Sequence, residues 1–166
     1  MRALFKAENL LVYAEKAAVI LLIFAMVALS FLQVLLRIFF NSGVVWLDPL
    51  LRYMVLWAGL LGAVLAARYS QHFALEAAFH FIPKKLHRPL QVCAALFTVF
   101  ASVLLFYAAY KVVRVDLDYA SAAFYVGNTA MSSGWLELII PAAFALIALH
   151  VLIGVFRPAD GKEAGA

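Results

Sequence analysis

The residues of this chain best suited to metal chemistry are His72, Glu76 and His80, which follow one helical face. Residues spaced four apart fall on the same side of an α-helix, and imidazole and carboxylate groups are common zinc ligands. A straight row over two turns does not converge on one ion, however, and no fourth ligand accompanies it. We therefore assign no metal site to this row.

Haem binding and nucleophilic catalysis find no better support. A haem held between helices needs pairs of histidines at matching depth, and His150 alone lies inside a long apolar segment. No Ser/His/Asp or Cys/His set stands at a compatible depth, and the single cysteine, Cys93, is expected to pack as a small apolar side chain. We predict that the chain is not an enzyme and has no catalytic, cofactor-binding or metal site.

The rest of the sequence is typical of a membrane protein, with 67% hydrophobic residues, 13% charged residues and a mean hydropathy of +1.01. Charged residues are absent from four long segments or confined to their ends. A hydrocarbon core about 30 Å thick needs roughly 20 helical residues. We predict an all-α membrane bundle, one domain over residues 1–166, with four transmembrane helices near residues 17–36, 48–68, 89–110 and 138–156.

The distribution of Lys and Arg predicts the orientation of these spans. With the N-terminus in the cytoplasm, nine of the 13 basic residues lie on that side, and four lie on the other. Basic residues are enriched in cytoplasmic loops, so both termini are expected there, in the inner membrane of a bacterium. The basic residues flank apolar segments and form no stripe, which argues against nucleic-acid binding.

The connections between spans have distinct patterns. Asp48 and Pro49 mark a helix start, the first as a cap and the second at the first helical position. The segment from Arg68 to Arg88, which connects spans two and three, predicts an amphipathic helix that lies in the membrane–water interface. Residues 127–134 are polar and glycine-rich, which predicts a surface loop, with Trp135 at the membrane boundary.

Small residues predict where helices pack closely in lipid. Two rows recur every seven positions in the third span: Ala94, Ala101 and Ala108, and beside them Ala95, Ser102 and Ala109. In the second span, Gly59 and Gly62 each begin a small-xxx-small pair. We expect these residues to pack helices together, within the chain or against another protein.

One ordered pattern resembles a known family. It consists of Trp46-Leu47-Asp48-Pro49-Leu50-Leu51-Arg52-Tyr53, then Trp57, Gly62, Arg68 and His72, with Gln33-Val34 and Arg37 before it and residues 129–141 after it. These residues resemble the small, DctQ-type membrane subunit of tripartite ATP-independent periplasmic (TRAP) transporters. Pro49 stands where that family commonly has a second acidic residue.

The resemblance implies a Na+-coupled importer of an organic acid, such as sialic acid or a C4-dicarboxylate. In that family a periplasmic binding protein captures the substrate, and a large membrane subunit moves it with Na+ by an elevator-type movement. The small subunit is a scaffold for the large one and helps to dock the binding protein. The implied partners are these two proteins and the membrane lipids, and Na+ coupling belongs to the large subunit.

No Asp, Glu, Lys or Arg lies deep in any predicted span, and Glu15 precedes the first span. The absence of deep charge is expected of a subunit that supports transport and does not itself move a charged solute. Asp48 and Arg52 stand four apart and are expected to pair. Two alternatives stay open, a membrane anchor subunit of a redox complex and a small self-assembling carrier. The residues expected to meet partners are Arg37, Trp46, Asp48, Arg52, Tyr53, Trp57, Asn128 and Trp135.

Overall fold

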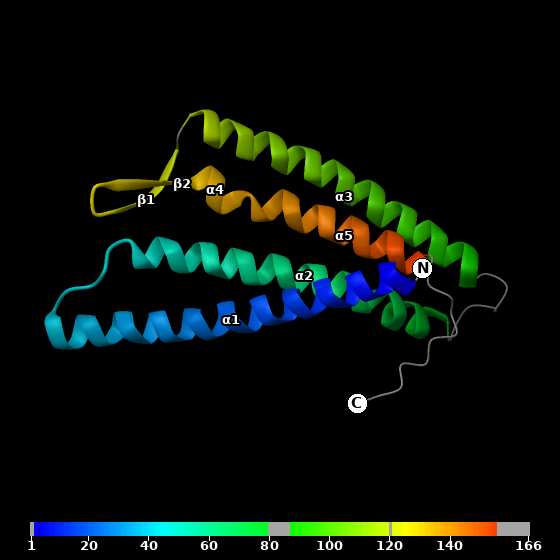
Figure 1. The fold of residues 1–166 in the computed structure, drawn as a ribbon, viewed down its shortest axis with the longest axis horizontal. Coiled ribbons are helices and arrows are strands. Elements are labelled where there is room, and N and C mark those ends of the chain that lie inside the picture. The colour runs from blue at the N-terminus through cyan, green and yellow to red at the C-terminus, as the bar shows by residue number, and fades with distance from the viewer. Residues whose placement is uncertain (1, 80–86, 120, 156–166) are drawn as a thin grey trace.

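The computed structural model describes residues 2–79, 87–119 and 121–155 of the chain (Figure 1). The long helices are α1 (Arg2–Phe40), α2 (Leu47–Phe79), α3 (His87–Asp118) and α5 (Ile139–Val155). Between α3 and α5 lie strands β1 (Ala122–Val126) and β2 (Thr129–Ser132) and the short helix α4 (Ser133–Glu137).

Four segments are long and apolar enough to cross a membrane: Asn9–Phe40, Leu47–Tyr69, Pro89–Asp118 and Ser133–Gly154. The shortest has 22 residues and measures about 33 Å as a helix, which matches a hydrocarbon core of about 30 Å. Each predicted span overlaps one of these segments, and the fourth combines α4 with α5. The predicted all-α membrane fold with four spans is therefore confirmed. The orientation of the termini and the single domain stay predictions.

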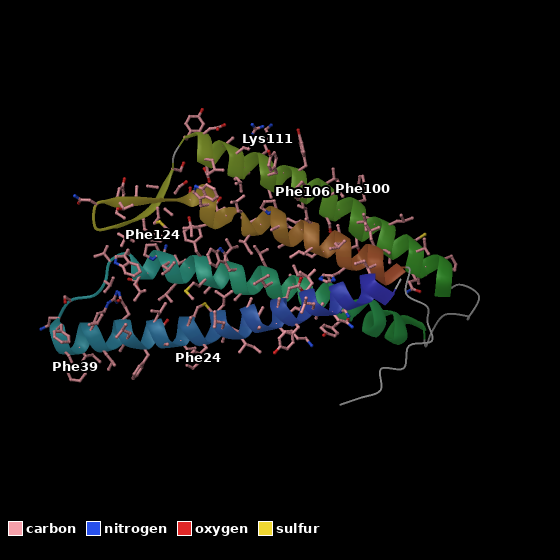
Figure 2. All side chains as sticks on the ribbon, in the orientation of Figure 1. Phe24, Phe39, Phe100, Phe106, Lys111 and Phe124 are labelled. Atoms are coloured by element: carbon pink, nitrogen blue, oxygen red, sulfur yellow. The ribbon has the colours of Figure 1, made fainter. Side chains whose placement is uncertain are left out.

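The long helices lie side by side in an open row, in the order α1, α2, α5, α3 (Figure 1). Helix α5 packs against α2 on one side and α3 on the other, whereas α1 packs chiefly against α2. Helices α1 and α3 therefore form the two edges of the row. Large apolar side chains on these edges are exposed, as Phe24 and Phe39 of α1 and Phe100 of α3 illustrate (Figure 2).

The two ends of the row differ in what they hold. One end, called here the hairpin end, carries the α1–α2 link, strands β1 and β2, and α4 (Figure 1). The other, called the terminal end, carries the start of α1 and the end of α5. Figure 1 shows that β1 and β2 project beyond the end of α4.

Of the two small-residue rows in α3, the row beginning at Ala95 is the one buried inside the chain. Ala95 and Ser102 are buried, and α3 packs mainly against α5, so these side chains allow the two helices to approach closely. The prediction that the other row packs helices within the chain is wrong for Ala94 and Ala108, which are exposed, whereas Ala101 is half-buried. A contact between that row and another protein stays a prediction.

Gly59 and Gly62 of α2 also do not pack closely within the chain. A β-carbon added at either glycine would meet nothing within 4 Å beyond the helix itself. Gly59 is exposed and Gly62 is half-buried. The intrachain packing expected of these glycines is therefore wrong, and the space beside them is open to a neighbour outside the chain.

Helix α2 continues without interruption to Phe79, so the segment with His72 and Glu76 is helical and continuous with the second span. His80 and residues 81–86 lie outside the described residues. The predicted interfacial helix between spans two and three stays a prediction.

The connection after the third span is a β-hairpin, not the predicted surface loop. Helix α3 extends to Asp118, and β1 pairs antiparallel with β2, with a bulge between Ala122 and Phe124. Gly127 begins the two-residue turn with φ 60°, the conformation that a II′ turn requires at this position. Phe124 is buried and anchors the hairpin (Figure 2). The alternating, β-favouring residues of 122–126 thus prevail over the loop-like composition around Gly127.

The fourth span is divided between α4 and α5 because of Pro141. Proline has no N–H to donate to the carbonyl of Glu137, and its ring clashes with that carbonyl in a regular helix. The chain leaves the α-helical pattern at Leu138 and resumes it at Ile139. This break lets α4 turn toward the end of α3.

Substituting Gly134 tests this close approach of α4 to α3. A β-carbon added at Gly134 would lie 2.7 Å from Leu117 Cγ and 3.1 Å from the Leu117 backbone nitrogen. We expect Gly134→Ala to lower the free energy of unfolding of the isolated chain in detergent by about 1–3 kcal/mol. Gly59→Ala is the matched control and should leave it unchanged or raise it, because the added methyl has space. Equal thermal midpoints for the two variants would contradict the packing described.

Candidate functional site

The α1–α2 link at the hairpin end is held by the side-chain amide of Gln33. Its Nε2 donates to the Val44 carbonyl at 3.1 Å, and the Val44 N–H donates back to Oε1 at 3.2 Å. Nε2 also lies 3.5 Å from Asp48 Oδ1. Gln33 is buried, so this reciprocal pair satisfies its amide where water is scarce. Gln33 therefore fixes where the chain turns from α1 into α2.

Local backbone features bring the link close to Gln33. Helix α1 ends at Phe40, and Asn41 follows in the left-handed conformation with φ 48°, a common way to end a helix. A β-carbon on Gly43 would lie 3.1 Å from both Arg37 Nε and Gln33 Nε2. Glycine at position 43 therefore allows both side chains to lie against the link.

Asp48 pairs across the two helices and not along its own. Arg37 Nη2 of α1 donates to Asp48 Oδ2 at 2.8 Å, and both side chains are about half exposed. Among the described residues no ion pair joins Asp48 to Arg52, so the expected pairing is wrong and the Arg52 side chain is exposed. Helix α2 begins at Leu47, which places Asp48 and Pro49 inside its first turn and not at the cap.

Trp57 connects α2 to the fourth span. Its indole Nε1 donates to the carbonyl of Leu136 at 2.8 Å, and Leu136 itself is buried. Carbonyls near a helix end lack intrahelical partners, and the break at Leu138 provides such an end. The sequence pattern included Trp57, but its acceptor could not be found without the position of α4.

The hairpin is attached to the end of α3 through two serines. The Ser133 N–H and hydroxyl both donate to the Ser121 carbonyl, at 2.8 and 3.2 Å. The Ser121 N–H donates to the Asp116 carbonyl at 3.1 Å, and its hydroxyl to Asp116 Oδ1 at 3.4 Å. The hairpin is thus held in a defined position by hydrogen bonds at its base.

The exposed part of this region is aromatic and uncharged. No Asp, Glu, Lys, Arg or His occurs from residue 119 to residue 136. We call four of the exposed side chains of this region, Tyr119, Tyr125, Asn128 and Trp135, the hairpin surface. Tyr119 is 81% exposed and Trp135 69%, so both rings present most of their surface outside the chain.

The residues predicted to meet partners share the hairpin end but do not form one site. Arg37 and Asp48 hold the α1–α2 link, and Trp57 holds α2 to α4. Arg52 and the hairpin-surface residues are exposed. Trp46 and Tyr53 are half-buried. A role of these residues in partner binding stays a prediction.

At the terminal end, the structure pairs two titratable groups that the sequence analysis treated separately. His150 Nε2 of α5 lies 3.1 Å from Glu15 Oε1 of α1, and both side chains are buried. Glu15 also belongs to a segment long and apolar enough to span a membrane, Asn9–Phe40. That segment is longer than a bilayer core requires, so the expectation that Glu15 stands just before the first span stays a prediction. A separation of 135 residues left no pattern by which the sequence could have paired them.

Replacing Gln33 tests whether the α1–α2 link depends on its amide. We expect Gln33→Leu to lower the free energy of unfolding by about 1–3 kcal/mol, because the Val44 N–H and carbonyl lose their partner. Thermal unfolding in detergent measures the loss, and hydrogen exchange at residues 43–46 should accelerate with it. Ser30→Ala, at an exposed position on the same helix, is the control. Unchanged exchange in the link of Gln33→Leu would refute this role.

Comparison with known proteins agrees with the sequence pattern and the four spans. Residues 26–161 match the family described as tripartite ATP-independent periplasmic transporters, DctQ component. Over 74 residues the chain is 36% identical to a protein of Haemophilus influenzae that is inferred to be a TRAP transporter small permease protein. That alignment covers 43% of this chain and 46% of the relative, so it spans about half the length of that protein. Because the family match covers most of the sequence, the chain belongs to the DctQ family of TRAP transporter membrane subunits.

Proposed function

We propose that this chain is the non-conducting support subunit of a TRAP transporter that imports an organic acid with Na+. The observation that carries the proposal is the open row of helices in a member of the DctQ family. A closed four-helix bundle would bury its small residues internally, whereas this row leaves Gly59 and other small residues of α2 facing outward. In lipid, such surfaces favour close packing with another helix.

The contact with the large membrane subunit is assigned to one stripe of α2. Five exposed residues recur at helical spacing on this helix: Arg52, Val55, Gly59, Ala63 and Ala66. The space beside Gly59 is open, so the backbone of a partner helix can approach there. Arg52, at the hairpin end of the stripe, supplies a cation for a carboxylate of the partner. We call these five residues the α2 stripe.

The hairpin end is assigned to the periplasm and both termini to the cytoplasm, in the inner membrane. Nine of the 13 basic residues then lie on the cytoplasmic side, as the positive-inside rule requires. This orientation directs the hairpin surface toward the compartment of the binding protein. Tyr and Trp are frequent in protein interfaces because they bury a large area with few rotatable bonds. The hairpin surface is therefore assigned to docking of the binding protein.

Transport itself is assigned to the large subunit. Sialic acid and C4-dicarboxylates are the substrate classes that the family resemblance implies, and Na+ coupling accompanies the substrate there. The support subunit supplies a fixed surface, since Trp, Lys and Arg at helix ends resist displacement along the membrane normal. A neighbouring domain can then move against it.

Enlarging one residue of the α2 stripe tests the contact with the large subunit. We expect Gly59→Leu to reduce the amount of large subunit that co-purifies by about tenfold, because the side chain fills the space needed by a partner helix. Ala28→Leu, at an exposed small residue of α1, is the matched control and should co-purify normally. Normal co-purification and uptake with Gly59→Leu would remove the α2 stripe from the interface.

Truncating the hairpin surface tests docking of the binding protein. We expect the double variant Tyr125→Ala, Trp135→Ala to raise the binding-protein concentration needed for half-maximal uptake by about tenfold or more. The maximal rate and the yield of the membrane complex should change little, because both side chains are exposed. Tyr107→Ala, at a 69% exposed position on α3, is the control. An unchanged half-saturating concentration would assign docking to other surfaces.

A further inference from the structure

The outer face of α3 changes from apolar to basic near the hairpin end. Lys111 and Arg114 are both exposed there, one turn apart on the same face of the helix. Figure 2 shows Lys111 on the side of α3 that faces away from α5. Among the described residues, no ion pair joins either cation to a carboxylate. Both charges are therefore available to a molecule outside the chain.

A short stack of rings along α3 orients Arg114. Its guanidinium carbon lies 5.9 Å from the centroid of the Tyr110 ring. The Phe106 ring stacks on that of Tyr110, with centroids 6.3 Å apart and an interplanar angle of 11°. The three side chains follow one another at intervals of four, so they lie along one side of the helix. Because the stack restricts the guanidinium, less side-chain entropy is lost when it binds an anion.

Both cations stand near the end of the third membrane-spanning segment. That segment, Pro89–Asp118, has 30 residues and measures about 45 Å as a helix. A hydrocarbon core of about 30 Å places the ends of such a helix among the headgroups. Lys111 and Arg114 lie within about two turns of Asp118, and long basic side chains extend toward the headgroups from such positions. Their charges can therefore reach the level of the lipid phosphates.

Toward the middle of the membrane, the same face of α3 carries large apolar and aromatic side chains. We call Phe100, Leu104 and Tyr107, each more than half exposed, the acyl face. Side chains of this size suit contact with acyl chains, whereas small residues suit close approach of another helix. Helix α3 is an edge of the row, so no described helix of this chain covers the acyl face. One surface thus combines acyl-chain contacts with a pair of cations.

We propose that Lys111 and Arg114 form a headgroup site for an anionic phospholipid, whose acyl chains lie along the acyl face. A phosphodiester fits this pair because the guanidinium presents several N–H donors in one plane, and the ammonium adds a second positive charge. A zwitterionic headgroup brings its own cation close to these residues. The site therefore prefers a lipid with a net negative charge.

The nearby carboxylates do not neutralise this site. Asp118 stands one turn beyond Arg114, but among the described residues no ion pair joins the two, and the guanidinium lies over Tyr110 instead. Asp116 is half-buried, and its Oδ1 accepts a hydrogen bond from the Ser121 hydroxyl at 3.4 Å. The positive charge of the pair is therefore left for the lipid.

Photocrosslinking from the acyl face tests the proposal at the site itself. Tyr107→p-benzoylphenylalanine keeps an aromatic side chain at this exposed position and captures the molecule that contacts it on illumination. The full chain is held in nanodiscs of phosphatidylcholine with phosphatidylglycerol as the minor lipid and identical acyl chains. Mass spectrometry gives the ratio of phosphatidylglycerol to phosphatidylcholine among the crosslinked products. We expect this ratio to exceed that of the nanodisc by about tenfold.

Substituting the cations separates a headgroup site from general contact with lipid. With Lys111→Gln and Arg114→Gln added together, the crosslinked ratio should fall to the nanodisc ratio. Arg52→Gln removes an exposed cation from α2 and is the control, which should leave the enrichment unchanged. The same probe at Phe24, an exposed ring of the opposite edge helix α1, should report the nanodisc ratio.

Two results from the isolated chain would overturn the proposal. The first is a crosslinked ratio at position 107 equal to that of the nanodisc, and the second is unchanged enrichment when both cations are replaced. In the complex with the large subunit, retained enrichment would support the lipid site, whereas crosslinks to protein in place of lipid would assign this face to a partner and overturn it. The measurements on the isolated chain do not depend on the contacts of the α2 stripe.

Discussion

The structure depends on a few buried hydrogen bonds near the ends of its helices. In lipid there is no hydrophobic driving force for apolar helices to associate, so close packing and polar contacts must position them. Gln33 of α1 holds the α1–α2 link. Glu15, which lies 18 residues earlier on α1 and about 27 Å away along it, contacts His150 of α5. This spacing is close to the hydrocarbon thickness of about 30 Å. Polar contacts thus hold α1 to its neighbours near both of its ends.

An open row of helices follows from this arrangement. Helices α2 and α5 each pack against a helix on both sides, whereas α1 and α3 lie at the edges of the row and leave broad apolar faces uncovered. Large side chains on such faces suit lipid, whereas the small residues of the α2 stripe suit a protein neighbour. The geometry therefore favours a subunit that completes its packing in a complex.

Much of the fold could be predicted because lipid imposes a simple rule on sequence. Four apolar segments gave four spans, and the pattern from Trp46 to His72 identified the family. The contacts between segments could not be predicted. Asp48 stands four residues before Arg52, which predicted a pair along α2, and only the position of the α1–α2 link brings Arg37 to it instead. Likewise, the seven-residue repeat in α3 permits two rows, and the position of α5 selects the one with Ala95.

The central claim is that this chain supports transport without conducting. Its most direct test is uptake of an organic acid by liposomes under an inward sodium gradient, with this chain reconstituted alone, with the large subunit, and with the large subunit plus binding protein. The account predicts no uptake by this chain alone and sodium-dependent uptake with all three proteins. Accumulation of the acid by liposomes that contain only this chain would contradict it.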